Sequence, residues 1–369
     1  MGAQSHKPRE GRLGYRTDMD KNKGRNWERS SSPRVERNPW TLRALLNALS
    51  HLKNLPYVVV CLSLVFHVVV YTPRLDAGAS GGEPGRFMSY GAGGRPLAMG
   101  GAFYAIADDA TAAYWNPAGL GVLERKEFTA MYAQLFAETT LGFIAYAHPL
   151  PGKGTIGVTY TQLTSGGFEK VRLVTDANGN ITDLITEGTF EDSQSGLGLA
   201  WGKAISGKLS LGFSGKMLRR QLDTSADSHL SMDVTSLARN LLPNYQLGFG
   251  IHNALAMKSG DTDDRLPLTI RVGNSYKLIK NKLGIGLDFD MSAHSGTSWK
   301  FGGEYWLLNW IAFRFGLQGD PGGGGSGGPR EMNFGAGLNY QNFSLDLANA
   351  IHELGLTTRF SGTWRFGAS

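Results

Sequence analysis

Alternation of apolar and polar residues dominates the chain from Lys126 to Phe366 and restricts it to a few folds. In one window Leu209, Leu211 and Phe213 alternate with Ser210 and Gly212. This period of two gives a strand one apolar and one polar face. Similar windows recur to the end of the chain, and no stretch after Leu123 has a clean helical period. So many two-faced strands cannot all be buried in one dry core, so the pattern favours a barrel with a hydrated interior.

The alternation divides the chain into about fourteen strands. A soluble β-sandwich would also alternate, but it does not need so many strands of this length. An even number of long strands is typical of a bacterial outer-membrane barrel. We therefore predict an all-β, transmembrane outer-membrane β-barrel over residues 126–366. Its expected strands are Lys126–Leu135, Thr140–Pro149, Gly154–Leu163, Ser195–Ala204, Lys208–Leu222, Ser228–Leu237, Tyr245–Asn253, Pro267–Leu278, Leu283–Met291, Ser298–Trp306, Asn309–Leu317, Met332–Tyr340, Phe343–Asn349 and Gly355–Phe366.

The lengths of the connections support the same architecture. Short links such as Ser206–Gly207 and Gln341–Asn342 alternate with longer ones such as Thr164–Gln194 and Asp223–Asp227. Short turns at one rim and long loops at the other are typical of outer-membrane barrels. Within the longest connection, residues 170–190 with Asn178-Gly179 at their centre predict a hairpin in an external loop.

The N-terminal part predicts export. Residues 1–53 carry 12 Lys+Arg against 5 Asp+Glu, which leaves 25 against 26 for the rest of the chain. The overall charge of +6 therefore does not indicate nucleic-acid binding. Residues 54–79 hold an apolar run and then Ala77-Gly-Ala79, so we expect a signal peptide cleaved between Ala79 and Ser80. A membrane anchor and a buried helix are the alternatives. Residues 1–53 are then either a cytoplasmic extension or a consequence of a start codon placed too far upstream.

Residues 80–125 lie between this leader and the first strand. Residues 80–94 are glycine-rich without a period, and we expect an extended lead-in. Alanines and the Asp108-Asp109 pair predict one or two helical turns within Phe103–Tyr114, ended by Asn116-Pro117 and Gly119. This short ordered segment before a barrel predicts a plug, or hatch, inside the lumen.

The same residues carry a family resemblance. Pro96-Leu-Ala-Met-Gly-Gly-Ala-Phe103, Ala107-Asp-Asp-Ala-Thr-Ala-Ala-Tyr-Trp-Asn-Pro-Ala-Gly-Leu120 and the closing Arg359–Phe366 resemble the PorV/PorQ family and, more loosely, FadL-type outer-membrane transporters. The resemblance implies a fourteen-stranded barrel with an N-terminal hatch. It also implies transport of hydrophobic, fatty-acid-like molecules, or a PorV-like role in type IX protein secretion. A purely structural surface barrel is the third possibility.

Candidate functional residues lie in the plug. The segment Trp115, Asn116, Pro117, Ala118 and Gly119 could be a moving latch, because proline beside glycine concentrates a backbone change in few residues, or a fixed turn before the first strand. Asp108 and Asp109 could hold the hatch shut through lumen arginines such as Arg271 or Arg314, or could cap the short helix.

The last strand has an aromatic face that includes Phe360, Trp364 and Phe366. It looks like the signal that the barrel-assembly machinery accepts, although Gly367-Ala-Ser369 follow it.

Enzymatic chemistry has no support in the sequence. The histidines after the leader are scattered and none has a partner at zinc spacing. We therefore expect no enzyme, metal or cofactor. The expected partners are outer-membrane lipid or lipopolysaccharide, the assembly machinery, and a hydrophobic small molecule or secreted cargo. We expect a monomer in the outer membrane of a Gram-negative cell after Sec export.

Overall fold

A computed structural model describes residues 84–259, 266–279, 282–293, 295–320, 330–352 and 354–367. The chain divides into two compact units, 1–47 and 48–369, and every described residue lies in the second. The predictions for residues 1–53, for the leader 54–79 and for the cleavage site at Ala79 and Ser80 fall outside the described residues.

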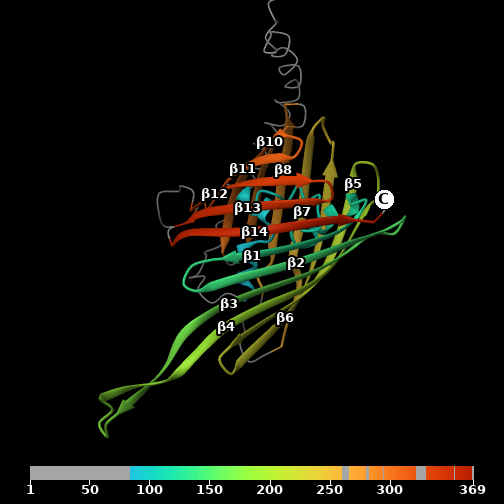
Figure 1. Cartoon of the computed structure of the whole chain (residues 1–369). Helices are drawn as coiled ribbons and strands as arrows, with labels where there is room; N and C mark the ends of the chain where they lie inside the picture. Colours follow the sequence, from blue (N-terminus) through green and yellow to red (C-terminus); the bar gives the residue numbers. More distant parts are fainter. Residues whose placement is uncertain are drawn as a thin grey trace, which may run out of the picture. The chain divides into compact units, whose positions relative to one another are not determined.

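Fourteen antiparallel strands form a closed barrel, in which each strand pairs with the next and β1 pairs with β14 (Figure 1). This confirms the predicted fold class. The strands are β1 (Lys126–Gln134), β2 (Thr139–Leu150), β3 (Gly154–Thr175), β4 (Ile181–Ala204), β5 (Leu209–Leu222), β6 (Ser225–Arg239), β7 (Tyr245–Ser259), β8 (Thr269–Leu278), β9 (Leu283–Ser292), β10 (Gly296–Leu308), β11 (Ile311–Gly319), β12 (Glu331–Tyr340), β13 (Phe343–His352) and β14 (Gly355–Phe366).

The two faces of the barrel wall differ as the alternation predicts. Leu199 and Phe213 point outward and are 58% and 47% exposed, while Ala200 and Ser214, their neighbours in sequence, are buried toward the lumen. An apolar outer face with a polar inner one is what a bilayer requires of a barrel. Among the described residues, no helix is long and apolar enough to cross a membrane.

The two rims of the barrel carry different connections. The turn rim holds the start of β1, the end of β14 and links such as 309–310 and 341–342. The loop rim holds the β7–β8 and β11–β12 connections, as predicted. One prediction was wrong here: the expected loop Asp223–Asp227 shrinks to two residues, because β6 begins at Ser225 and pairs there with Leu222.

The predicted hairpin at 170–190 exists, but it continues wall strands rather than standing apart in a loop. Beyond Ser165 of β3 and before Asp192 of β4, these strands pair only with each other. The turn lies at residues 176–180, and the paired strands extend past their neighbours (Figure 1). A register shift between Ser165 and Phe168 marks the point where the hairpin leaves the wall.

The plug comprises η2 (Arg86–Tyr90), α3 (Gly94–Ala98), α4 (Ala112–Trp115) and η3 (Pro117–Val122). Helix α3 packs against β11–β14, while η3 packs against β2–β6. The helical turn predicted within Phe103–Tyr114 is present only at its end, in α4, and the earlier helix α3 was not predicted. The Gly94–Ala98 segment is too short for a period to reveal it.

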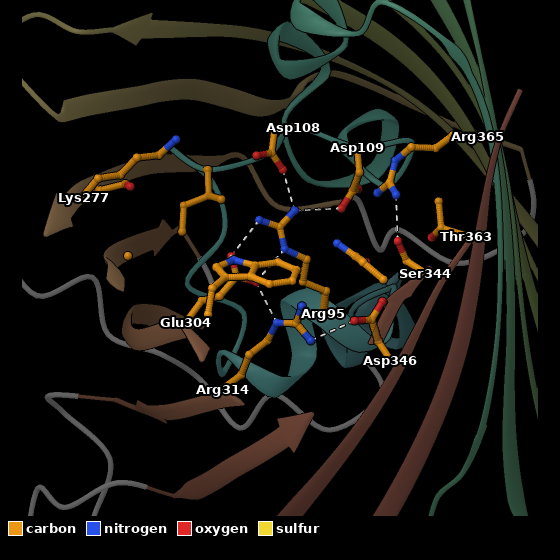
Figure 2. Close-up of a pocket in the computed structure, with 15 residues that line it drawn as sticks. Arg95, Asp108, Asp109, Lys277, Glu304, Arg314, Ser344, Asp346, Thr363 and Arg365 are labelled. Atoms are coloured by element: carbon orange, nitrogen blue, oxygen red, sulfur yellow. Dashed lines mark hydrogen bonds and ion pairs between the residues drawn. The ribbon is translucent and has the colours of Figure 1, made fainter. Parts of the chain in front are cut away.

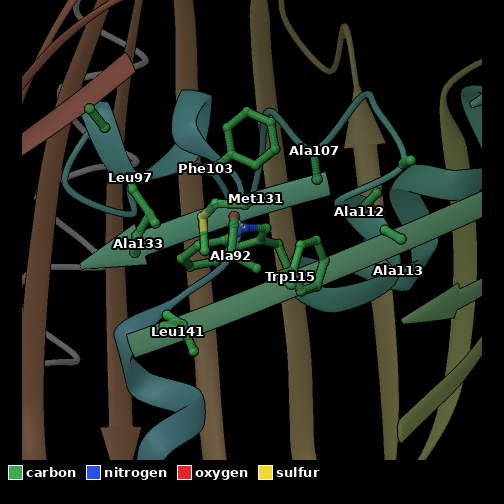
Figure 3. Close-up of a cluster of buried hydrophobic side chains, with 14 of the residues drawn as sticks. Ala92, Leu97, Phe103, Ala107, Ala112, Ala113, Trp115, Met131, Ala133 and Leu141 are labelled. Atoms are coloured by element: carbon green, nitrogen blue, oxygen red, sulfur yellow. Dashed lines mark hydrogen bonds between the residues drawn. The ribbon is translucent and has the colours of Figure 1, made fainter. Parts of the chain in front are cut away.

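An apolar cluster joins the plug to the wall. Ala92, Phe103 and Trp115 of the plug pack with Met131 of β1 and Leu141 of β2 (Figure 3). The largest apolar cluster of the described residues thus lies inside the barrel. The plug is therefore part of the folded core rather than a loose terminus.

Candidate functional site: the plug and its contacts with the barrel wall

Arg95 of α3 is the centre of an ion-pair cluster between plug and wall. Its Nη1 lies 2.6 Å from Asp108 Oδ1 and 3.3 Å from Asp109 Oδ2, both within the plug. Its Nε and Nη2 donate to the two carboxylate oxygens of Glu304 on β10, at 2.8 and 3.1 Å. Burial opposes the charged form, but the carboxylates of Asp108 and Glu304 hold the pKa of Arg95 well above its usual value. Arg95 therefore stays charged and binds three acids.

The cluster continues along the wall through Arg314 of β11. Arg314 Nε donates to Glu304 Oε2 at 2.7 Å, and its Nη1 donates to Asp346 Oδ1 of β13 at 2.8 Å. Glu304 also accepts a hydrogen bond from the indole of Trp306 at 3.1 Å. Figure 2 shows Glu304 between the two arginines. A carboxylate shared by two buried guanidinium groups couples the plug to three wall strands.

A polar cavity of about 280 Å³ borders this cluster. Its lining includes Lys277, Ser344 and Arg365, which lie near the turn-rim ends of β8, β13 and β14 (Figure 2). A second cavity of about 240 Å³ shares Asp108 and Lys277 with it. The space between plug and wall on the turn-rim side is therefore lined by charged and polar side chains.

The two aspartates expected to pair with arginines of the barrel wall pair with an arginine of the plug instead. Asp108 and Asp109 bind Arg95, whereas Arg271 binds Asp290 and Arg314 binds Glu304 and Asp346. Asp109 also accepts from the backbone N–H of Thr111 at 2.9 Å, next to the first residue of α4. Asp109 thus combines a local turn at the start of α4 with an ion pair inside the plug, and neither Arg271 nor Arg314 is its partner among the described residues.

The Asn116–Gly119 segment is a bonded turn in this structure. Asn116 is fully buried, its amide donates to Tyr104 O at 2.9 Å, and its Oδ1 accepts from Ala118 N at 3.1 Å. Ala118 N also donates to Thr235 Oγ1 of β6 at 3.0 Å. A Cβ on Gly119 would lie 2.1 Å from Ala107 O. These contacts favour the fixed turn over the latch.

Trp115, the residue before this turn, is also held in place. Its indole N–H donates to Ala92 O at 2.7 Å, and Lys300 Nζ of β10 lies 5.8 Å from its ring centre. A cation above an indole face is a favourable contact. Trp115 therefore links two parts of the plug, the segment between η2 and α3 and the end of α4, to the wall. The extended lead-in expected over 80–94 is wrong at Arg86–Tyr90, which form η2.

A second polar tether joins Tyr104 of the plug to β5, β6 and β7. Tyr104 Oη lies 3.0 Å from His252 Nε2, and His252 Nδ1 lies 3.2 Å from Asp233 Oδ2. Asp233 also binds Lys216 Nζ at 2.9 Å and accepts from Ser214 at 2.8 Å. The scattered histidines of the sequence concealed this chain of contacts, because its members come from three strands.

A third group of charges faces the same tyrosine. Arg271 of β8 lies 5.4 Å from the Tyr104 ring centre and donates to Asp290 of β9 at 2.6 Å. Lys300 donates to the other oxygen of Asp290, also at 2.6 Å. The Tyr104 backbone N–H donates to Asp288 at 2.8 Å. Of this group, only Arg271 was named from the sequence, as a lumen arginine. The signal for Asp288, Asp290 and Lys300 was charge on the polar face of alternating strands.

The aromatic residues of the last strand lie where the alternation places them. Phe360 and Trp364 point outward, and Trp364 stacks on Phe343 of β13 and on Phe366, with ring centres 6.0 and 4.4 Å apart. The stack lies at the turn rim. Its role as an assembly signal stays a prediction.

Comparison with known proteins supports the fold. No family model and no curated sequence matches the chain. Among solved structures it is similar to the toluene transporter TbuX of Ralstonia pickettii (TM-score 0.54, 14% identity, 75% of this chain and 99% of that one) and to the monoaromatic hydrocarbon channel CymD (0.52, 13%, 75% and 98%). A Pseudomonas aeruginosa FadL homologue also matches (0.49, 11%, 75% and 98%). The TbuX and CymD matches show that the chain shares their barrel fold, and none of the matches bears on the PorV/PorQ resemblance.

Proposed function

We propose that this chain is an outer-membrane transport barrel that admits hydrophobic small molecules through a lumen controlled by its plug. The observation that carries the proposal is the Arg95 cluster, which binds the plug to β10 and, through Glu304 and Arg314, to β11 and β13. Ion pairs between plug and wall are contacts that a gated lumen would have to exchange when the plug shifts. The similarity in fold to toluene and monoaromatic hydrocarbon transporters supports the same conclusion.

The arrangement of the plug indicates how it would work. Gly85 lies against Leu266, near the loop rim, while η3 packs on Gly202 and Gly212 nearer the turn rim. The plug thus separates the loop-rim part of the lumen from the polar cavities. A compound that enters from outside would pass only if α3 or the segment after it shifts.

Uptake by cells tests this function. A null strain and the same strain carrying the gene receive radiolabelled toluene, and we expect saturable uptake only with the gene. Deleting residues 107–120 removes α4 and part of η3 from the plug. The deletion should abolish saturable uptake and raise leakage of hydrophilic solutes, because the lumen then lacks an ordered plug. A gel-mobility difference between heated and unheated samples shows that the deletion variant still forms a barrel. Equal uptake with and without the gene would refute the proposal.

A second candidate is a role in protein secretion, which the PorV/PorQ resemblance implies. The observation that favours it is the β3–β4 hairpin, which extends beyond the wall and exposes Val171, Leu173, Ile181 and Leu184. Exposed apolar side chains outside a membrane suit a protein partner. Affinity purification of the whole barrel and of a variant with residues 168–190 replaced by a short turn tests this role. Secretion components bound only to the unaltered barrel would support it.

Export and localisation are part of the same proposal. We infer a Gram-negative outer-membrane location, reached by Sec export and barrel-assembly machinery, with lipid or lipopolysaccharide around a monomeric barrel. N-terminal sequencing of protein from purified outer membranes should begin at Ser80. A product that retains the leader would identify an anchor instead.

A further inference from the structure

The hydroxyl of Tyr104 connects the plug to a histidine of the barrel wall. Tyr104 is fully buried, and among the described residues only His252 of β7 bonds to its hydroxyl, with Nε2 at 3.0 Å from Oη. A Cβ on Gly250 of β7 would lie 1.9 Å from the same Oη, so the hydroxyl packs against a strand without a side chain at that point. The Tyr104 carbonyl accepts from the side-chain amide of Asn116 at 2.9 Å. The position of Tyr104 therefore affects the turn that begins at Asn116.

Contacts on both ring nitrogens indicate a neutral His252 with one defined tautomer. Nδ1 lies 3.2 Å from Asp233 Oδ2. Lys216 Nζ lies 2.9 Å from the same oxygen, as expected of an ionised carboxylate, which can only accept hydrogen bonds. Nδ1 therefore carries the ring proton. Nε2 of the neutral ring then accepts from the Tyr104 hydroxyl, and every polar atom of the pair has a partner.

The charges around this pair are balanced while His252 is neutral. The charged groups that surround it, directly or through one ion pair, are Lys216 of β5, Asp233 of β6, Arg271 of β8, Asp288 and Asp290 of β9, and Lys300 of β10. Three bases thus face three acids. A proton on His252, whose ring is buried, would add one uncompensated positive charge.

Protonation of His252 would also change the direction of its bond with Tyr104. Both nitrogens of an imidazolium donate, so Nε2–H would use the Tyr104 oxygen as its acceptor. The Tyr104 O–H would then need another acceptor, and no other described residue bonds to it. A buried hydroxyl without an acceptor and an extra buried charge both favour a state in which Tyr104 leaves the ring.

We propose that His252 makes the plug sensitive to pH: the neutral ring holds Tyr104, and uptake of a proton releases Tyr104 and loosens the plug. The proposal rests on the proposed function in one respect, that the plug controls the lumen. Because the held state requires the neutral ring, the released state binds more protons. Lower pH therefore shifts the plug toward release.

Leakage of a small hydrophilic dye from lipid vesicles that contain the full-length barrel tests this switch. The pH is varied from about 8 to about 5, the range in which histidine changes its charge. We expect leakage to rise about tenfold as the pH falls if the released state binds the proton about tenfold more tightly. His252→Gln keeps an acceptor for the Tyr104 hydroxyl and does not titrate, so its leakage should stay constant over the same range.

A second Tyr–His pair in the wall provides the matched control. His148 Nδ1 of β2 lies 2.9 Å from Tyr146 Oη. This pair is on the outer face of the wall, because Ala145 and Ala147 beside it are buried toward the lumen. His148→Gln should therefore respond to pH like the unaltered barrel.

Asp288 is the other group through which acid can act on Tyr104. It accepts from the Tyr104 backbone N–H at 2.8 Å, and its Oδ1 is buried without a partner among the described residues. Asp288→Asn should keep the pH response. A response that is lost in Asp288→Asn and retained in His252→Gln would overturn the assignment to His252.

Nitrogen NMR of the histidine rings in the unaltered barrel supplies a measurement that needs no variant. His252 should carry its proton on Nδ1 at about pH 8 and take up a second one across the leakage transition. Leakage that does not change with pH, or a His252 ring that stays neutral while leakage rises, would overturn the proposal. The outcome is independent of uptake: a pH response in a barrel that takes up no toluene would refute toluene transport and leave the switch.

Discussion

Arg95 shows how one side chain can determine the state of the plug. It binds two acids of its own segment and one of the wall, so any movement of α3 away from β10 must break its pair with Glu304. In a buried setting that separation is costly, because each charge then lacks its partner. The opening that we propose would therefore require a compensating interaction, from a ligand or from a shift of the neighbouring charges.

We predict that Glu304→Gln loosens the plug. The change keeps the shape but leaves Arg95 and Arg314 without a shared carboxylate, and breaking a buried pair costs about 3 to 5 kcal/mol. Urea unfolding followed by gel mobility should show the loss of stability, and leakage of hydrophilic solutes should rise. Asp320→Asn is the control, because it removes an exposed ion pair with Arg330. Equal loss of stability and equal leakage in the two variants would mean that Glu304 does not hold the plug in place.

The plug as an element depends on glycines in the wall. A Cβ on Gly212 of β5 would lie 2.1 Å from Ala118 N, and one on Gly316 of β11 would lie 2.1 Å from Gly100 N. Only a strand without side chains at these points lets the plug backbone reach the wall. Some of the 51 glycines of the chain are thus needed where the plug backbone contacts the wall.

We predict that Gly212→Ala displaces η3, whereas Gly215→Ala on the same strand has little effect. The first methyl group would overlap backbone atoms, and overpacking costs about 1 to 3 kcal/mol. The second would meet nothing within 4 Å. Thermal unfolding and solute leakage measured on both variants check the difference. If Gly212→Ala changed neither thermal unfolding nor leakage, η3 would not be packed on β5 in the membrane.

Over the whole molecule, apolar and charged side chains are distributed as a lipid surrounding requires. Large apolar side chains cover the outer wall, while Lys216, Arg271 and Lys300 are turned toward acids inside the lumen. An apolar exterior around a charged interior is stable only if lipid covers the outside of the barrel. The β3–β4 hairpin, beyond the end of the wall, would then be outside the lipid.

Two leucines of β4 test this organisation. Leu199 in the wall and Leu184 in the hairpin are similarly exposed, at 58% and 61%. We predict that Leu199→Lys destabilises the barrel by about 2 to 4 kcal/mol if it lies near the bilayer midplane. Leu184→Lys should be close to neutral. Unfolding in lipid vesicles measures both, and equal effects would contradict a membrane boundary between the two positions.

Much of the barrel could be predicted from sequence because alternation is a local property. Strand positions from Lys126 onward needed only the period of two, and β9 and β12 lie within one residue of the prediction. The limits of β3 and β4 could not be predicted, since residues 164–194 alternate too weakly to show that they continue the wall. Helix α3 was missed because its five residues are ordered by contacts with β11–β14.

The chemistry of the lumen was decided by tertiary structure alone. The sequence by itself determined the barrel, its strand number and the presence of a plug, because each depends on residues that are close in the chain. Which arginine meets which acid depends on strand register and closure, which bring Arg95 to Glu304 across 209 positions. The same closure buries atoms of Arg359, Asn333 and Thr357 that have no hydrogen-bond partner among the described residues. Pairing inside a closed wall is a long-range property, and no local pattern encodes it.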